Sequence, residues 1–103
     1  MNNTDIHELK ALFMQLLEIF QKHGDSSIKP QANTVRIILE VIDDGRYLND
    51  EEKIVDIKIY FRKLYTPQGG FAEFYIWKED FEERIAANEP LDKIRDRLEE
   101  VLR

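Results

Sequence analysis

The choice between an all-α and an α+β fold rests on residues 34–42, Thr-Val-Arg-Ile-Ile-Leu-Glu-Val-Ile. At helical spacing this segment presents one apolar stripe, made of Val35, Ile38, Leu39 and Ile42. At the two-residue spacing of a strand, the apolar set is instead Val35, Ile37, Leu39 and Val41, and β-branching favours this reading. Asn33 as a cap and Asp43-Asp44-Gly45 as a stop signal favour a helix over residues 33–44, which we expect.

The segment that follows has a clearer helix start. Glu52 comes three residues after Asn49, which is the spacing of a capping box. Apolar residues then repeat at helical spacing, at Ile54, Ile57, Phe61 and Leu64. This pattern predicts a helix over residues 50–65, although residues 55–59 also alternate like a strand. Two strands here would form a central hairpin within residues 34–60, and this α+β fold is the alternative.

The two ends of the chain predict helices more directly. Residues 4–23 carry one broad apolar stripe, formed by Ile6, Leu9, Leu12, Phe13, Leu16, Leu17, Ile19 and Phe20. Thr4 is a suitable N-cap for this helix, and Gly24 is placed for a left-handed C-cap. A last helix is expected over residues 90–102, with Pro90 in its first turn.

The connection over residues 66–88 is expected to be compact. Thr66-Pro67-Gln68-Gly69-Gly70 predicts the end of the third helix. A short charged helix is expected over residues 78–87, with Phe81 and Ile85 turned inward. Together these elements predict an all-α, antiparallel bundle of about four main helices, which forms a single domain over residues 1–103.

The composition limits the classes of function. The chain has 103 residues, of which 43% are hydrophobic, no cysteine, and a formal net charge of −6. The lack of cysteine excludes disulfides, thiolate zinc sites and thiol nucleophiles. The negative charge disfavours nucleic acid and anionic membranes as partners, and it favours a basic protein. Because the sequence has neither a signal-peptide pattern nor a membrane-spanning apolar run, we expect a cytoplasmic location and no membrane partner.

No group of residues has the spacing of a catalytic, metal or cofactor site. His7 and His23 would lie about 24 Å apart on one helix, too far to share a metal. We interpret His23 as a cation at the end of that helix. The acidic residues 43–52 do not fit the register of an EF-hand loop, and the carboxylates of residues 79–83 are typical of a solvated helix face. We therefore expect no enzyme activity and no cofactor.

The aromatic residues 71–77, Phe-Ala-Glu-Phe-Tyr-Ile-Trp, are the best candidate for a binding surface. Tyrosine and tryptophan are enriched at protein interfaces because they bury a large area at a small entropic cost. The sequence leaves open whether these rings belong to the core or to an interface. The candidate contact residues for a protein partner are Tyr65, Tyr75, Trp77, Asp80 and Glu83.

Several short motifs also occur in a recognisable order. They are Leu16-Leu17, Leu64-Tyr65, Gly69-Gly70-Phe71 with Glu73, and Asn88-Glu89 with Leu91. This layout resembles a family of small bacterial helical proteins of unassigned function, some of which are encoded near polymorphic toxins. Where that family has a Gly-x-Gly-like turn, this chain has Gln68-Gly69-Gly70. The resemblance implies no catalytic residues, and it implies an immunity protein that neutralises a toxin by binding it.

Two functions are therefore expected from the sequence. The first is a non-catalytic protein-binding module, of the immunity type, whose partner is a basic toxin domain. The alternative is a structural or regulatory adaptor that acts through homo-oligomerisation.

Overall fold

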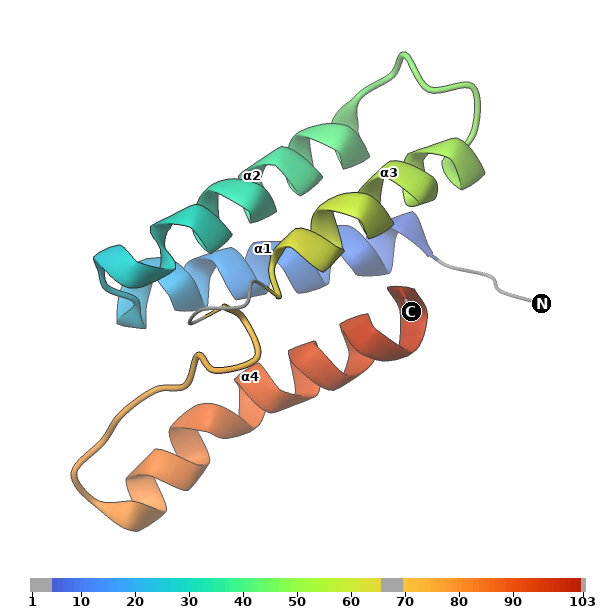
Figure 1. The fold of residues 1–103 in the computed structure, drawn as a ribbon. Helices are drawn as coiled ribbons and strands as arrows, with labels where there is room; N and C mark the ends of the chain where they lie inside the picture. The colour runs from blue at the N-terminus through green and yellow to red at the C-terminus, as the bar shows by residue number, and fades with distance from the viewer. Residues whose placement is uncertain (1–4, 66–69, 103) are drawn as a thin grey trace.

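The computed structural model describes residues 5–65 and 70–102, and this part of the chain contains four α-helices and no strand (Figure 1). The helices are α1 (Ile6–His23), α2 (Lys29–Asp43), α3 (Asp50–Lys63) and α4 (Phe81–Leu102). A 3₁₀ turn, η1 (Ser26–Ile28), joins α1 to α2. The prediction of an all-α bundle is confirmed, and the alternative with a central hairpin over residues 34–60 is wrong.

The buried side chains of α2 show why the ambiguous segment is helical. Val35, Ile38 and Ile42 are buried at helical spacing. Ile37, which a strand would place on the same face as Val35, is exposed. The core therefore selects the three-and-four spacing, because only a helix buries this set of side chains against α1 and α3.

The start of α2 lies earlier than predicted. The helix begins at Lys29 rather than at residue 33, and Pro30 stands in its first turn, where the missing N–H would have no partner in any case. Asn33 is consequently inside the helix and not its cap. Its side chain accepts a hydrogen bond of 2.7 Å from Arg36.

The start of α3 has the N-cap that the capping-box spacing predicts, although the Glu52 carboxylate accepts from the N–H of Leu48 instead of that of Asn49. Asn49 is the N-cap, and its side chain accepts a hydrogen bond of 2.9 Å from the N–H of Glu52. The loop before it is joined to α3 by the Tyr47 hydroxyl, which donates to Asp56. This bond raises the pKa of Tyr47 to about 12. These local contacts make α2 and α3 an antiparallel pair (Figure 1).

The ends of α1 depart from the prediction in detail. Asp5 is the N-cap and accepts a hydrogen bond of 2.8 Å from the N–H of His7; the predicted cap, Thr4, lies outside the described residues. Gly24 has φ −83° and ψ 157°, so it is extended and not a left-handed cap. A side chain at Gly24 would instead clash with Ile28 and with the carbonyl oxygen of Phe20, because the chain turns closely into η1.

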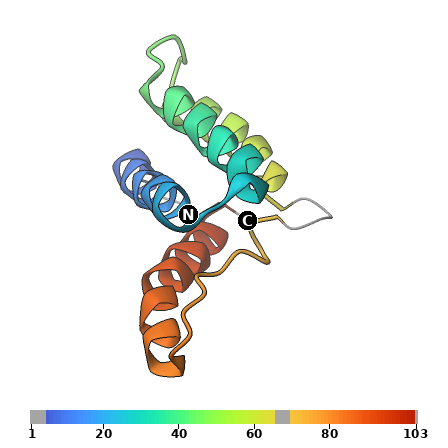
Figure 2. The same ribbon diagram turned by 90° about the vertical axis from the view of Figure 1, so that its left-hand side faces the viewer.

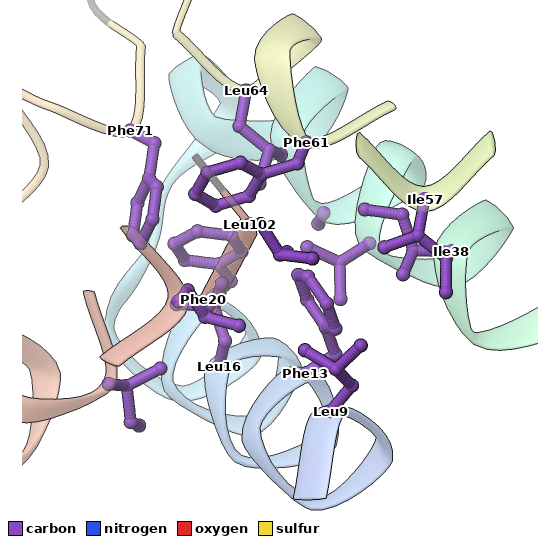
Figure 3. Packing of buried hydrophobic residues seen from close by; sticks show 14 of the residues in the cluster. Leu9, Phe13, Leu16, Phe20, Ile38, Ile57, Phe61, Leu64, Phe71 and Leu102 are labelled. Atoms are coloured by element: carbon purple, nitrogen blue, oxygen red, sulfur yellow. The ribbon is translucent and has the colours of Figure 1, made fainter. Parts of the chain in front are cut away.

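The hydrophobic core lies where α1, α2 and α3 meet, and α4 packs along the remaining side of α1 (Figures 1 and 2). Aromatic rings form its centre (Figure 3). Phe13 and Phe61 pack edge to face with ring centroids 6.5 Å apart, and Phe20 and Phe71 do so at 6.0 Å. Each fully buried ring or aliphatic side chain contributes about 1.5–3 kcal/mol through burial.

Helix α4 differs most from the prediction. The expected short helix over 78–87 and last helix over 90–102 form one continuous helix, and Pro90 lies inside it. All buried residues of α4 come after Pro90, at Leu91, Ile94, Leu98 and Leu102. The half before Pro90 extends away from the other helices (Figure 1). The predicted inward orientation of Phe81 and Ile85 is therefore wrong: they are 66% and 55% exposed.

Side-chain pairs fix the direction of α4 against α1. Arg97 donates two hydrogen bonds to the Glu8 carboxylate, at 2.8 and 2.9 Å, and this contact lowers the pKa of Glu8. Further along, Leu12 and Ile94 line the same shallow groove between the helices. Residue numbers thus rise along α1 as they fall along α4, which confirms the antiparallel arrangement.

Candidate protein-binding site

The candidate site is built on the segment that leads into α4, residues 71–80, which we call the strap. Its first residue, Phe71, is fully buried and anchors the strap in the core. The Phe71 N–H donates a 2.7 Å hydrogen bond to the carbonyl of Leu64. Its ring packs against Phe20 and Tyr65, so the start of the strap is held by core packing.

A cation on α4 holds the first turn of the strap. The Arg95 guanidinium lies 4.8 Å from the centroid of the Phe71 ring. Its Nη2 donates to the carbonyls of Phe71 and Phe74, at 2.9 and 2.7 Å. The Phe74 ring packs edge to face on Phe20, with centroids 5.1 Å apart. Charge-assisted hydrogen bonds of this kind are about twice as strong as neutral ones, so Arg95 keeps the strap on the bundle.

The middle of the strap is held by one amide side chain. Asn88 of α4 accepts a 2.7 Å hydrogen bond from the N–H of Ile76, and its amide donates a 2.8 Å bond to the carbonyl of Ile76. The same amide donates to the carbonyl of Arg84. Ile76 is only 4% exposed. Asn88 thus satisfies the main chain of a buried strap residue from the side of α4.

The exposed rings of the strap follow on either side of Ile76. Tyr75 and Trp77 are 55% and 62% exposed. One face of the Trp77 indole is covered by the Arg84 guanidinium, whose central carbon lies 3.9 Å from the ring centroid. Arg84 also donates a 2.9 Å hydrogen bond to the carbonyl of Lys78. The indole is therefore fixed on one face and open on the other.

Asp80 and Glu83 form the junction between the strap and α4. The carbonyl of Asp80 accepts from the N–H of Arg84, and its carboxylate accepts from the N–H of Glu83, both at 2.9 Å. Asp80 therefore caps α4, and Glu83 stands in its first turn, where negative charge is favourable. Both residues are exposed beside the strap.

A groove of about 400 Å³ runs along the strap on the side of η1. Phe74, Tyr75, Ile76 and Trp77 line one wall together with Glu73. The other wall is the turn between α1 and α2, with the side chains His23, Asp25, Ser27 and Ile28. Hydrogen bonds from Ser27 lower the pKa of Asp25, so its carboxylate is charged at neutral pH.

His23 at the edge of this groove is not the cation that its position in the sequence suggested. Partial burial, followed by the positive charges of Lys22 and Lys78, lowers the pKa of His23 from its ordinary value of 6.5. The unfolded chain therefore binds more protons than the folded chain just below pH 6.5, and His23 opposes folding as the pH falls through this range. Above it, His23 is neutral in both states.

This shift yields a prediction for Lys78. Replacing Lys78 with glutamine removes one positive charge near the groove, so we expect the pKa of His23 to rise toward 6.5. An NMR titration of the His23 ring protons measures it. Lys58→Gln on α3 removes the same charge at a position that does not contribute to the His23 shift, and it should leave this pKa unchanged. An unchanged His23 pKa in the Lys78 variant would contradict the assignment.

The structure brings four of the five predicted contact residues together. Tyr75, Trp77, Asp80 and Glu83 lie on the strap and the first turn of α4. Tyr65 lies outside the strap, just after the end of α3, and packs against Phe71 at the start of the strap. It is half-buried, its hydroxyl donates a 2.6 Å hydrogen bond to Glu99, and its ring packs against Phe61.

Comparison with known proteins adds no relative. No family model, curated protein or solved structure matches this chain. The resemblance to small bacterial proteins near toxins therefore stays a prediction.

Among residues 5–65 and 70–102, no three His, Cys, Asp or Glu side chains are grouped so that they could hold a metal ion. In the same part of the chain, no helix combines the length and apolarity needed to cross a membrane.

Sequence reasoning missed two apolar members of this surface, Phe81 and Ile85. They are four residues apart and share a face of α4 with Arg84 and Asn88, the residues that hold the strap. Their spacing identified a common face but could not show that this face lies outside the core. We call the exposed apolar residues Tyr75, Trp77, Phe81 and Ile85 the anchor surface.

Proposed function

We propose that this protein is a non-catalytic protein-binding module that docks a basic partner through the anchor surface. The observation that carries the proposal is Trp77, which is 62% exposed although the Arg84 guanidinium stacks on one face of its ring. Exposed tryptophan beside other exposed apolar side chains marks interaction sites, because burying it in a partner is strongly favourable.

The fixed position of the indole strengthens this proposal. Binding normally costs about 0.5–1.5 kcal/mol for each flexible side chain that becomes ordered. The stack on Arg84 orders the Trp77 ring, and the hydrogen bonds from Asn88 order the main chain of the preceding residue, Ile76, before any partner arrives. The open face of the ring is then available as a preorganised anchor, which a partner can cover at a smaller entropic cost.

The charges around the anchor surface favour a basic partner. The exposed carboxylates are those of Glu73, Glu79, Asp80, Glu82 and Glu83. The nearby cations are Lys78 and Arg84, and Arg84 is already engaged by Trp77. Such a rim attracts a positively charged protein and speeds its association. A basic toxin domain is the partner class implied by the resemblance, and neutralisation would follow from covering its functional surface.

An affinity pull-down from the native host tests this proposal. Wild-type protein is compared with the double variant Trp77→Ala, Phe81→Ala, and the captured partner is then titrated by calorimetry. We expect the double variant to bind at least tenfold more weakly, because two central apolar contacts are lost. The affinity should also fall with added salt, because the rim is exposed.

Two controls make the result specific. Val55→Ala on α3 removes an exposed apolar side chain away from the strap, so it should bind like wild type. Glu83→Lys reverses one charge of the acidic rim and so tests the contribution of that rim to binding. Asp80 is less suitable for this test, because a change there would also remove the cap of α4. A partner that binds the double variant and wild type equally would show that the anchor surface is not the binding site.

One observation favours homo-oligomerisation as the second candidate. Phe81 and Ile85 form an exposed apolar pair on the half of α4 that has no buried residue. Two copies of this half-helix could pair through the same face. Light scattering of the wild type and of Ile85→Glu decides this: a dimer that the variant converts to a monomer would favour self-assembly, and a monomeric wild type would exclude it.

A further inference from the structure

The hydrogen bonds of Ile76 define the conformation of the strap. Its N–H and its carbonyl both bond to the side-chain amide of Asn88. The N–H and C=O of one residue point to the same side only when that residue is extended, as in a β-strand. Asn88 therefore pairs with Ile76 in the way that a neighbouring strand would.

The side chains of the strap confirm this conformation. Exposure alternates along the segment: Phe74 is half-buried, Tyr75 exposed, Ile76 buried and Trp77 exposed. Alternation with a period of two is the pattern of an extended chain in which one face is covered. The middle of the strap is therefore extended as a β-strand is, although within the described residues it pairs with no other strand and forms no sheet.

A single strand has a second edge, and here that edge is unpaired. In an extended chain, successive residues direct their main-chain groups to opposite sides, so the N–H and C=O of Tyr75 and Trp77 point away from Asn88. Within the described residues these groups have no hydrogen-bond partner. Their edge therefore faces away from α4. The 400 Å³ groove between the strap and the η1 turn is lined by these same strap residues.

We propose that this edge binds an extended, basic segment of the partner protein as an added β-strand. The inference rests on the proposed binding function and specifies how the partner is recognised. The main chain of the segment would pair with Tyr75 and Trp77, as occurs when peptides add to an exposed sheet edge. Positively charged side chains would be directed toward Asp25 and Glu73, the carboxylates that line the groove.

A matched pair of variants at residue 77 tests the role of the main chain. Trp77→Ala and Trp77→Pro both remove the indole, but only proline also removes the N–H. Proline favours an extended preceding residue, and Ile76 is already extended. The N–H that proline removes has no partner in the free protein within the described residues, so both variants should fold alike.

The probe is a peptide selected on the wild-type protein from a phage-displayed library of random 12-residue sequences. The selected peptide is synthesised and its affinity for the three proteins is measured by calorimetry. We expect Trp77→Ala to bind about tenfold more weakly than wild type, and Trp77→Pro at least tenfold more weakly than Trp77→Ala. Equal affinities of the alanine and proline variants would overturn the inference.

A second measurement uses only wild-type protein and so does not depend on the folding of a variant. A peptide that pairs through one edge uses the N–H groups of every second residue. Methylating those backbone nitrogens should abolish binding, and methylating the nitrogens between them should leave it unchanged. In NMR spectra, the amide signals of Tyr75 and Trp77 should shift on binding. Unchanged amides, indifference to methylation, or a selection that enriches no peptide would each overturn the inference.

These outcomes separate the inference from the proposed function. A host partner that needs Trp77 and Phe81 but binds Trp77→Pro as well as Trp77→Ala would use the side chains of the anchor surface without adding a strand. The binding function would then stand, and the added strand would be excluded. If the double variant Trp77→Ala, Phe81→Ala also bound the partner normally, both would fail.

Discussion

Replacing Phe71 with alanine is expected to lower the free energy of unfolding by about 3–5 kcal/mol. Phe71 is fully buried, and its ring contacts Phe20 of α1 and Tyr65, which follows the end of α3. Alanine would leave a cavity between α1 and the end of α3. It would also remove the ring under the Arg95 guanidinium, so Arg95 would lose its cation–π contact as well.

Urea unfolding followed by circular dichroism measures this loss. Phe81→Ala is the matched control, because it makes the same chemical change at a side chain that is 66% exposed. We expect the control to change the free energy of unfolding by no more than about 0.5 kcal/mol. Similar losses in the two variants would contradict the assignment of Phe71 to the core and Phe81 to the surface.

The second large effect is expected at Asn88. Asn88→Ala removes three hydrogen bonds, and it leaves the N–H and carbonyl of the buried Ile76 unpaired. An unpaired buried polar group costs about 1–3 kcal/mol, so the middle of the strap should detach from α4. We expect the amide of Ile76 to exchange with solvent about thirtyfold faster, which corresponds to about 2 kcal/mol.

Hydrogen exchange followed by NMR checks this residue by residue. Amides of α1 and α2 should keep their protection, because the side-chain hydrogen bonds of Asn88 join α4 to the strap. Asn33→Ala is the control, since the side chain of Asn33 bonds Arg36 on the surface of α2, far along the chain from the strap. If the Ile76 amide in Asn88→Ala exchanged as slowly as in wild type, the hydrogen bonds between Asn88 and Ile76 would not be what holds the strap on α4.

The prediction for Asn88 also bears on partner binding. Asn88→Ala keeps the whole anchor surface but frees the strap to move, so a partner would have to order it again. We therefore expect weaker partner binding with unchanged contact residues, which is the signature of lost preorganisation.

The elements that could be predicted from sequence are those defined by contacts between near neighbours. The Asn49–Glu52 cap formed as its spacing indicated. The apolar stripe of α1 is buried at Leu9, Phe13, Leu16 and Phe20. In both cases the interacting groups lie within one or two helical turns, so their relation is set by helix geometry and needs no knowledge of the rest of the fold.

Pro90 shows why other features escaped prediction. A proline at the start of a helical pattern usually marks a first turn, and here α4 continues through it. The residues before it are held as a helix by contacts with the strap, namely Asn88 with Ile76 and Arg84 with Trp77. Those contacts join residues of two different segments, and no local pattern in the sequence specifies them.

The sequence by itself favoured an all-α chain and determined its net charge and its lack of cysteine chemistry, because composition and periodicity act locally along each helix. Tertiary structure alone decided that Phe71 enters the core while Tyr75, Trp77, Phe81 and Ile85 stay exposed. Helical or strand spacing shows which side chains share a face. Which face is covered depends on the available core volume, and α1, α2, α3 and the half of α4 after Pro90 already fill it.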